Sequence, residues 1–149
     1  MNNKHDTLDK AICIASCAHC GQTNKDGTPY ILHPLRLMMK AETPEEKTVA
    51  VLHDVLEDCP DYQQATSRIL NGYLHSALLS VTKREGEDYE DFIKRCGANA
   101  IGRKVKLLDL YDNIDLTRLT EVGEWELKRT LKYHKAIMWL RGLEKTAGV

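Results

Sequence analysis

The stretch from Thr43 to Pro60, TPEEKTVAVLHDVLEDCP, carries four side chains that could do acid-base or metal chemistry: His53, Asp54, Glu57 and Asp58. Because side chains four residues apart lie on one face of an α-helix, His53 would stack with Glu57. Asp54 would stack with Asp58 in the neighbouring row. Charged groups set among Ala, Val and Leu must reach solvent or find a partner, since burying an unpaired charge is costly. A metal ion is one such partner, and a solvated helix face is the alternative.

A second group of polar residues interrupts the apolar periodicity of residues 104–119, KVKLLDLYDNIDLTRL. Asp109 and Asn113 are four apart and share a helix face, with Asp112 and Asp115 on either side. Apolar residues occupy most of the remaining surface of this predicted helix. We therefore expect Asp109 to be partly buried, where it would also need a partner.

A third candidate, His33, follows a polar loop at residues 21–30, GQTNKDGTPY, and immediately precedes Pro34. A residue before proline is disfavoured in the helical region of backbone conformation. His33 is therefore predicted at a break in the chain, with a helix beginning at Pro34 and running to about Ala41.

The stretch around His53 is predicted to form one continuous helix. Thr43 is a good N-cap, Pro44 suits the first helical position, and Glu46 stands three residues after Thr43, which completes a capping box. Cys59-Pro60 would end the helix. The four polar residues would then lie in its last two turns.

The remaining pattern is helical throughout. Apolar residues recur at three- and four-residue steps in segments 6–20, 73–83, 89–97 and 124–143, and we find no strand-like alternation. The last of these segments would close a bundle. The sequence therefore predicts an all-α helical bundle.

Length and charge exclude several classes of function. A chain of 149 residues is the size of a single domain, 1–149, with a core that buries about two thirds of its unfolded surface. A net charge of −1, with both signs spread along the chain, offers no basic face for nucleic acid and no polybasic tail for a membrane surface. Any anionic ligand must be bound by local cations.

Compartment signals favour the cytoplasm. The opening segment MNNKHDTLDK lacks the apolar core of a signal peptide, and no apolar run approaches the roughly 18 residues of a membrane span. Five cysteines, an odd number, fit a reducing compartment better than a disulfide framework. We therefore expect a cytoplasmic protein with no membrane partner, and the sequence leaves its oligomeric state open.

Taken together, three stretches resemble a known family: AHCGQTNKDGTPYILHPL at 18–35, AVLHDVLEDCP at 50–60 and KVKLLDLYDNIDLTRL at 104–119. In this order and spacing they are similar to HD-domain hydrolases of the RelA/SpoT type, including small stand-alone alarmone hydrolases that lack a synthetase domain. The resemblance reaches from about residue 5 to residue 120. It implies an all-α HD-domain helical bundle, in agreement with the periodicity.

The resemblance also implies roles for individual residues. A divalent metal, often Mn²⁺, would be held by four side chains: His33, His53, Asp54 and Asp109. The acidic pair Glu57 and Asp58 would be catalytic, and Asn113 would contact the bound nucleotide. Two imidazoles with two carboxylates suit Mn, Fe, Co or Zn equally, so the ligand types alone do not choose the ion.

The implied reaction is hydrolysis of a nucleotide phosphoester or pyrophosphate by a metal-activated water, with (p)ppGpp-like 3′-pyrophosphates as the leading substrates. Two departures bear on that substrate. Alarmone hydrolases usually carry Arg where this chain has Asn24, and often carry Arg where it has Leu110. Both cations would have helped to hold a guanine nucleotide or its phosphates.

Other cations could replace the two that are missing. Lys25, Lys83 and Arg84 are the candidates, and we expect ligand contacts in loop 21–29 and in the turn at 83–89, which ends at Tyr89. Two alternatives stay open. One is a phosphatase or pyrophosphohydrolase for another nucleotide, such as NADPH, and the other is a non-catalytic HD domain that binds a nucleotide.

Overall fold

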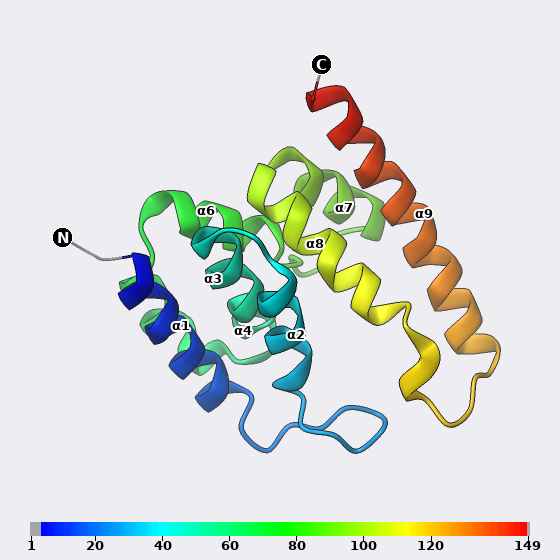
Figure 1. Cartoon of the computed structure of the whole chain (residues 1–149), viewed down its shortest axis with the longest axis horizontal. Helices are drawn as coiled ribbons and strands as arrows, with labels where there is room; N and C mark the ends of the chain where they lie inside the picture. Colours follow the sequence, from blue (N-terminus) through cyan, green and yellow to red (C-terminus); the bar gives the residue numbers. More distant parts are fainter. Residues whose placement is uncertain (1–3, 149) are drawn as a thin grey trace.

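The computed structural model describes residues 4–148 and is all-α, as predicted (Figure 1). Its α-helices are α1 (Lys4–Ala18), α2 (Leu32–Lys40), α3 (Pro44–Leu52), α4 (Val55–Asp58), α5 (Gln63–Ile69), α6 (Gly72–Ser80), α7 (Tyr89–Ala98), α8 (Ala100–Asn113) and α9 (Glu124–Ala147). Two 3₁₀ turns, Pro60–Tyr62 and Leu116–Arg118, join them. Within the described range the only β-type pairing is an isolated bridge between Thr23 and Pro29. Residues 1–3 and 149 of the predicted domain lie outside the described residues.

Helix α3 lies at the centre of the bundle and packs against α1, α2, α6 and α8. Six of its nine residues are buried, including Val49, Ala50, Val51 and Leu52. Its second half, from Thr48 to Leu52, is buried on every side, as expected of a helix in the core. The predicted capping box is confirmed, because Thr43 Oγ1 accepts from the Glu46 N–H at 3.1 Å and Glu46 Oε2 accepts from the Thr43 N–H at 3.3 Å.

The prediction of one continuous helix through His53 and Asp54 is wrong. Helix α3 ends at Leu52, and α4 is a separate turn after a two-residue break. His53 Nδ1 donates to the Ala50 carbonyl oxygen at 2.8 Å, and this oxygen is the one that a continuous helix would offer to the Asp54 N–H. The imidazole thus replaces a backbone donor, and the chain turns at the two residues that give the stretch its chemistry.

The predicted break at His33 is also wrong, because α2 begins at Leu32 and contains both His33 and Pro34 in its first turn. N–H groups in the first turn of a helix have no partner within the helix, so a proline there removes no hydrogen bond. His33 is therefore fixed on a helix and buried, rather than placed in a flexible joint.

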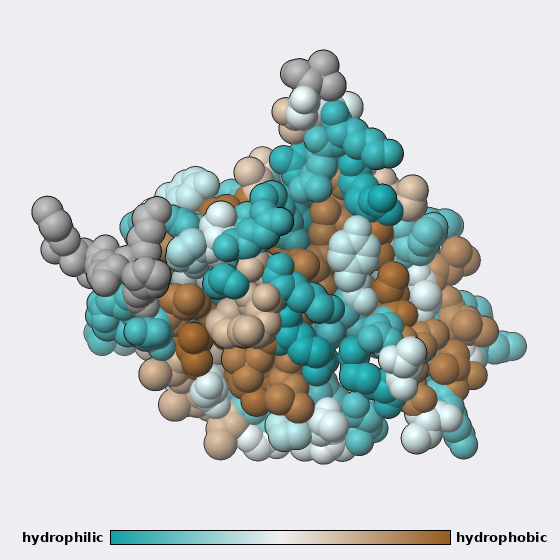
Figure 2. All heavy atoms as spheres, viewed as in Figure 1, coloured by the Kyte–Doolittle hydropathy of each residue, from teal (hydrophilic) through white to brown (hydrophobic). Residues whose placement is uncertain are grey.

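Helix α9 packs on α7 and α8 through a second hydrophobic cluster, separate from the main core. Its buried members are Ile93, Leu107, Leu110, Ala136, Ile137 and Leu140. Other apolar residues of α9 are exposed, among them Leu131 and Trp139, and hydrophobic and hydrophilic surface alternate along α9 in Figure 2. In the part of the chain that the structure describes, none of the helices has the length and apolar character needed to cross a bilayer.

Candidate active site

Three side chains from distant parts of the sequence meet at one buried point. His33 comes from α2, His53 from the turn after α3, and Asp109 from α8. His33 Nε2 lies 3.1 Å from Asp109 Oδ1 and 3.3 Å from His53 Nε2, and the third side of this triangle is 3.7 Å. Metal-ligand distances of about 2.0–2.2 Å place neighbouring ligand atoms about 3–3.6 Å apart, so the triangle has the size that one cation requires.

Asp54, the fourth predicted ligand, lies at the edge of this triangle. Its Oδ2 is 2.9 Å from His53 Nε2 and accepts a hydrogen bond from the Tyr30 hydroxyl. Among the described residues, the group whose ligand atoms all lie within 4.8 Å of one another contains the other three side chains and not Asp54.

Hydrogen bonds at the far nitrogen of each imidazole fix its orientation. His33 Nδ1 donates to Asp112 Oδ2 at 2.6 Å, and His53 Nδ1 donates to the Ala50 carbonyl. Arg36 binds both oxygens of Asp112 at 2.8 and 2.9 Å, which holds that carboxylate in place. Both Nε2 atoms therefore face the centre of the site, where a lone pair could be offered to a metal.

Asp109 is held from two sides on its own helix. Lys106 Nζ lies 2.7 Å from Oδ2, and Asn113 Nδ2 donates to Oδ1 at 2.7 Å. These residues stand three before and four after Asp109, so all three share one face of α8. The orientation of the carboxylate is thereby set before any ligand arrives.

Carboxylates lie close to both imidazoles: Asp109 and Asp112 to His33, and Asp54 and Asp109 to His53. Burial alone would lower the pKa of His33, but the hydrogen bonds that it donates to Asp109 and Asp112 outweigh this effect and raise that pKa to about 9. Burial would likewise raise the pKa of Asp109, yet Lys106 and His33 hold it well below the usual range. Carboxylates that stabilise positive charge on an imidazole would also favour a bound cation, so the donor set fits a divalent metal.

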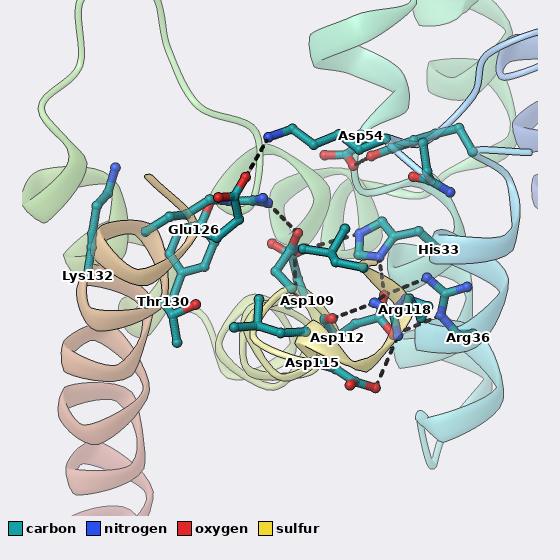
Figure 3. Close-up of a pocket in the computed structure, with 18 of the residues that line it drawn as sticks. His33, Arg36, Asp54, Asp109, Asp112, Asp115, Arg118, Glu126, Thr130 and Lys132 are labelled. Carbon is teal, nitrogen blue, oxygen red and sulfur yellow. Dashed lines mark hydrogen bonds and ion pairs between the residues drawn. The ribbon is translucent and has the colours of Figure 1, made fainter. Parts of the chain in front are cut away.

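A cavity of about 720 Å³ opens beside the three ligand atoms, within the range of nucleotide-sized pockets. Figure 3 shows His33 and Arg36 on one side, Asp109 and Asp112 on α8 below, and Glu126, Thr130 and Lys132 of α9 on the other side. The lining includes most residues predicted for catalysis and substrate binding: Lys25, Glu57, Asp58, Lys83, Tyr89 and Asn113. Arg84 is not among the described residues that line the cavity. Its backbone N–H donates to the side chain of Glu87.

The two acidic side chains after the His-Asp pair reach solvent inside this cavity. Partial burial and the nearby Asp54 carboxylate raise the pKa of Glu57 and of Asp58. A carboxylate with a raised pKa is a better proton acceptor near neutral pH.

The two departures from the alarmone-hydrolase pattern have clear structural roles. Asn24 Nδ2 donates to Thr28 Oγ1 at 3.2 Å and to the Pro29 carbonyl at 3.3 Å, so it closes the loop on itself. Leu110 is 1% exposed and packs in the second hydrophobic cluster under α9. Position 110 is thus part of the packing beneath α9 and offers no side chain to a ligand.

The sequence did not predict several of the residues that line the cavity: Arg36, Lys106, Asp112, Trp125, Arg129, Lys132 and Tyr133. The spacing of Lys106 and Asp112, three residues on either side of Asp109, is a signal that could have found both. The four residues on α9 carry no such signal, because charged and apolar residues at helical spacing are typical of any amphipathic surface helix.

The sequence is similar to several curated bacterial proteins. A guanosine-3′,5′-bis(diphosphate) 3′-pyrophosphohydrolase of Vibrio cholerae is 29% identical over 119 residues, which is 72% of this chain and 17% of that protein. The bifunctional (p)ppGpp synthase/hydrolase SpoT of Escherichia coli is 33% identical over 89 residues, 56% of this chain and 12% of that protein. A further pyrophosphohydrolase, from Aquifex aeolicus, is 29% identical over 138 residues, 85% of this chain and 19% of that protein.

The chain thus spans less than a fifth of the length of these relatives. No protein-family model matches it.

Proposed function

We propose that this chain, which is similar in sequence to HD-domain enzymes of the RelA/SpoT type, is a metal-dependent phosphohydrolase that acts on a nucleotide. The observation that supports this most strongly is the approach of His33 Nε2, His53 Nε2 and Asp109 Oδ1 to within 4.8 Å of one another from three separate helical segments. Leucine or valine at these buried positions would stabilise the fold better than histidine or aspartate, so these polar side chains indicate a function.

In this proposal the three ligands and the adjacent Asp54 hold one divalent cation. When bound, the cation would lower the pKa of a water molecule and polarise a phosphoryl oxygen. Glu57 or Asp58 accepts the proton of the attacking water, and the raised pKa of each suits that role. Asn113 fixes Asp109 and faces the substrate cavity.

The leading substrates are (p)ppGpp-like nucleotides that carry a 3′-pyrophosphate, since the relatives are named for hydrolysis of guanosine-3′,5′-bis(diphosphate). We further propose Mn²⁺ as the ion, a single domain over residues 1–149, a cytoplasmic location and no binding to nucleic acid. The even distribution of charge supports the last of these.

The test is turnover of a nucleotide panel by purified protein with added Mn²⁺. The panel holds ppGpp, pppGpp, NADPH and nucleoside mono-, di- and triphosphates. Asp54→Ala should lose bound metal, whereas Glu57→Gln should keep metal and fold and lose turnover by about 100-fold or more. Glu85→Gln, an exposed glutamate outside the cavity, is the matched control.

Three outcomes would change the assignment. Wild-type turnover by Glu57→Gln would remove that residue from the mechanism. Saturable binding of a nucleotide without release of phosphate or pyrophosphate would favour the non-catalytic alternative. Cleavage of NADPH, but not of ppGpp, would keep the chemistry and change the substrate, as the absence of arginine at position 24 allows.

A further inference from the structure

A second groove, of about 940 Å³, lies between α7 and α9, two helices that pack side by side (Figure 1). Its floor is apolar and includes the buried side chains of Ile93 and Ala136. Two large apolar side chains that also line it, Leu131 and Trp139, are 58% and 42% exposed. Apolar surface gathered in a groove and rimmed by polar residues is typical of a contact between proteins.

The two sides of this groove carry opposite charges. On the α9 side, Lys128, Lys132 and Lys135 recur at three- and four-residue steps and therefore share one face of the helix. On the other side, the start of α7 contributes the exposed carboxylates of Asp88 and Glu90. The groove thus has a basic edge and an acidic edge with apolar surface between them.

Most of these charges have no ionic partner within the chain. Among the described residues, no carboxylate lies within ion-pair distance of the three lysines of α9, and no cation lies within that distance of Glu90. Lys94, the remaining charged residue of the groove, pairs with Asp91 at 3.4 Å. Both edges therefore offer charge that is free to pair with another molecule.

This distribution of charge favours a second copy of the same chain as the occupant. An anionic membrane surface, a nucleic acid or an acidic peptide presents only negative charge, which Asp88 and Glu90 would repel. A two-fold dimer uses the same patch on both copies, so that patch must be complementary to itself. A patch with an apolar centre and opposite charges on its two edges meets this condition.

Contacts between α7 and α9 show which residues lie at the same level of the groove. Near the start of α7, the ring centroids of Tyr89 and Tyr133 are 6.2 Å apart. Near its end, Gly97 lies so close to α9 that a Cβ there would stand 2.8 Å from both Trp139 and Leu143. The two helices therefore run in the same direction.

This parallel course determines how two copies would meet. A two-fold axis along the groove places α7 of one copy against α9 of the other at the same level. Glu90 of one copy then faces Lys135 of the other, because both residues lie next to the tyrosine contact. An axis across the groove would instead set the lysines of α9 against each other, which like-charge repulsion opposes.

We infer that this chain forms a two-fold homodimer through the groove between α7 and α9, with the axis along the groove. The apolar surfaces of the two copies form its centre, and a pair of Glu90 and Lys135 flanks that centre on each side. The inference is independent of the proposed function. Tyr89 and Lys132 line both this groove and the active-site cavity, so the second copy covers one wall of that cavity from outside.

Sedimentation velocity of the full chain measures the oligomeric state directly. The charged edges are exposed to solvent, so we expect a Kd of about 1–10 μM, at the weak end for interfaces of standard size. At about 100 μM, wild type should therefore sediment with twice the mass of one chain. Trp139→Ala should weaken the dimer about 30-fold, as expected when an aromatic side chain is removed from the centre of an interface.

Charge reversal tests the arrangement of the two copies. Glu90→Lys and Lys135→Glu each place like charges across the interface twice, and either variant alone should dimerise at least about 10-fold more weakly. Mixed with each other, the two variants should form a dimer of near wild-type affinity, because both contacts of the mixed dimer pair opposite charges. Lys145→Glu, the same change on the same helix outside the groove, is the control and should leave the dimer unchanged.

The outcomes that would overturn the proposal are distinct. A monomer at about 100 μM would exclude the dimer. Binding of that monomer to phosphatidylglycerol vesicles or to polyglutamate, lost in Lys135→Glu, would then assign the groove to a membrane surface or to an acidic partner. A dimer that none of the groove variants weakens would place the interface elsewhere, and two charge variants that stay monomeric when mixed would overturn the axis along the groove. None of these results depends on turnover, so failure of the hydrolase proposal would leave the dimer standing.

Discussion

At the scale of single residues, Asp112 connects α8 to the imidazole of His33 on α2. It accepts from His33 at 2.6 Å and is itself held by Arg36 and Arg118, and it is 2% exposed. A carboxylate behind a ligating histidine fixes the ring and raises its basicity. Burial would raise the pKa of Asp112, but His33 and Arg36 outweigh this and hold its pKa far below the usual value, so it is ionised at neutral pH.

We therefore expect Asp112→Asn to weaken Mn²⁺ binding about 10-fold, because an amide is a poorer acceptor for the His33 N–H. Isothermal titration calorimetry on protein first stripped with EDTA measures this. Asp115→Asn is the matched control, since that carboxylate is 44% exposed and its hydrogen bonds among the described residues go to Thr117 and Arg118. Equal affinities for the two variants would show that Asp112 has no role at the metal site.

The residues that meet at the site were predictable, but their supporting contacts were not. Charged groups in apolar surroundings predicted His53 and Asp109, and the resemblance added His33. The partner of each was hidden because it comes from another element: Asp112 bonds to a histidine 79 positions earlier in the chain. Spacing along one helix cannot predict a contact that depends on how two helices pack.

At the scale of elements, the segment after α6 is fastened to α7 by one arginine. Arg95 binds Glu87 at 2.7 Å and donates to the carbonyls of Leu79 and Thr82. The hydrogen bond from Arg95 lowers the pKa of Glu87 to about 2. This segment carries Lys83, which lines the cavity.

The low pKa of Glu87 predicts a stability loss in acid. A folded-state value near 2, below the unfolded value of about 4.3, adds stability that is complete above pH 4.3 and lost as the pH falls toward 2. The ion pair lies in a surface loop, so solvent screening limits its contribution to the free energy of unfolding to about 1 kcal/mol. The free energies of unfolding of wild type and Glu87→Gln, measured in urea from pH 7 to pH 3, should therefore converge as the pH falls. A constant difference would contradict the assignment.

The boundaries of elements show where local sequence signals fail. The capping box at Thr43 is a contact within one turn, and it was predicted correctly. The break at His53 and Asp54 was not predicted. There the side chain of His53 binds a carbonyl oxygen that a regular helix would use for a backbone hydrogen bond, and apolar periodicity does not reveal this. The helical start of α2 was missed for a related reason, since Pro34 falls in the one turn that tolerates it.

At the scale of the whole molecule, the cavity lies between two hydrophobic clusters. The metal-site residues of α2 and of the turn after α3 belong to the side of the main core, while α9 is held by the second cluster. Leu140 is fully buried in that second cluster. Its packing therefore helps to hold α9 in place beside the cavity.

Leu140→Ala should lower the free energy of unfolding by about 3 kcal/mol, through lost burial and a cavity under α9. Urea denaturation measures this. The same substitution at Leu131, which is 58% exposed on the same helix, should cost less than about 0.5 kcal/mol. Similar losses for both would mean that α9 does not pack on the second cluster as described.

The all-α architecture was predictable because apolar residues recur at helical spacing along most of the chain, whereas the contribution of α9 to the cavity was not. Its inward face packs and its first turns line the cavity, and both functions use residues that the pattern assigns to packing or to solvent.

Helix α8 serves both halves: Val105 packs into the main core, and Leu107 and Leu110 pack under α9. The position of Asp109, which lies on the same helix, is therefore tied to the packing of both clusters. A shift of α8 on either side would move this carboxylate away from His33 and His53.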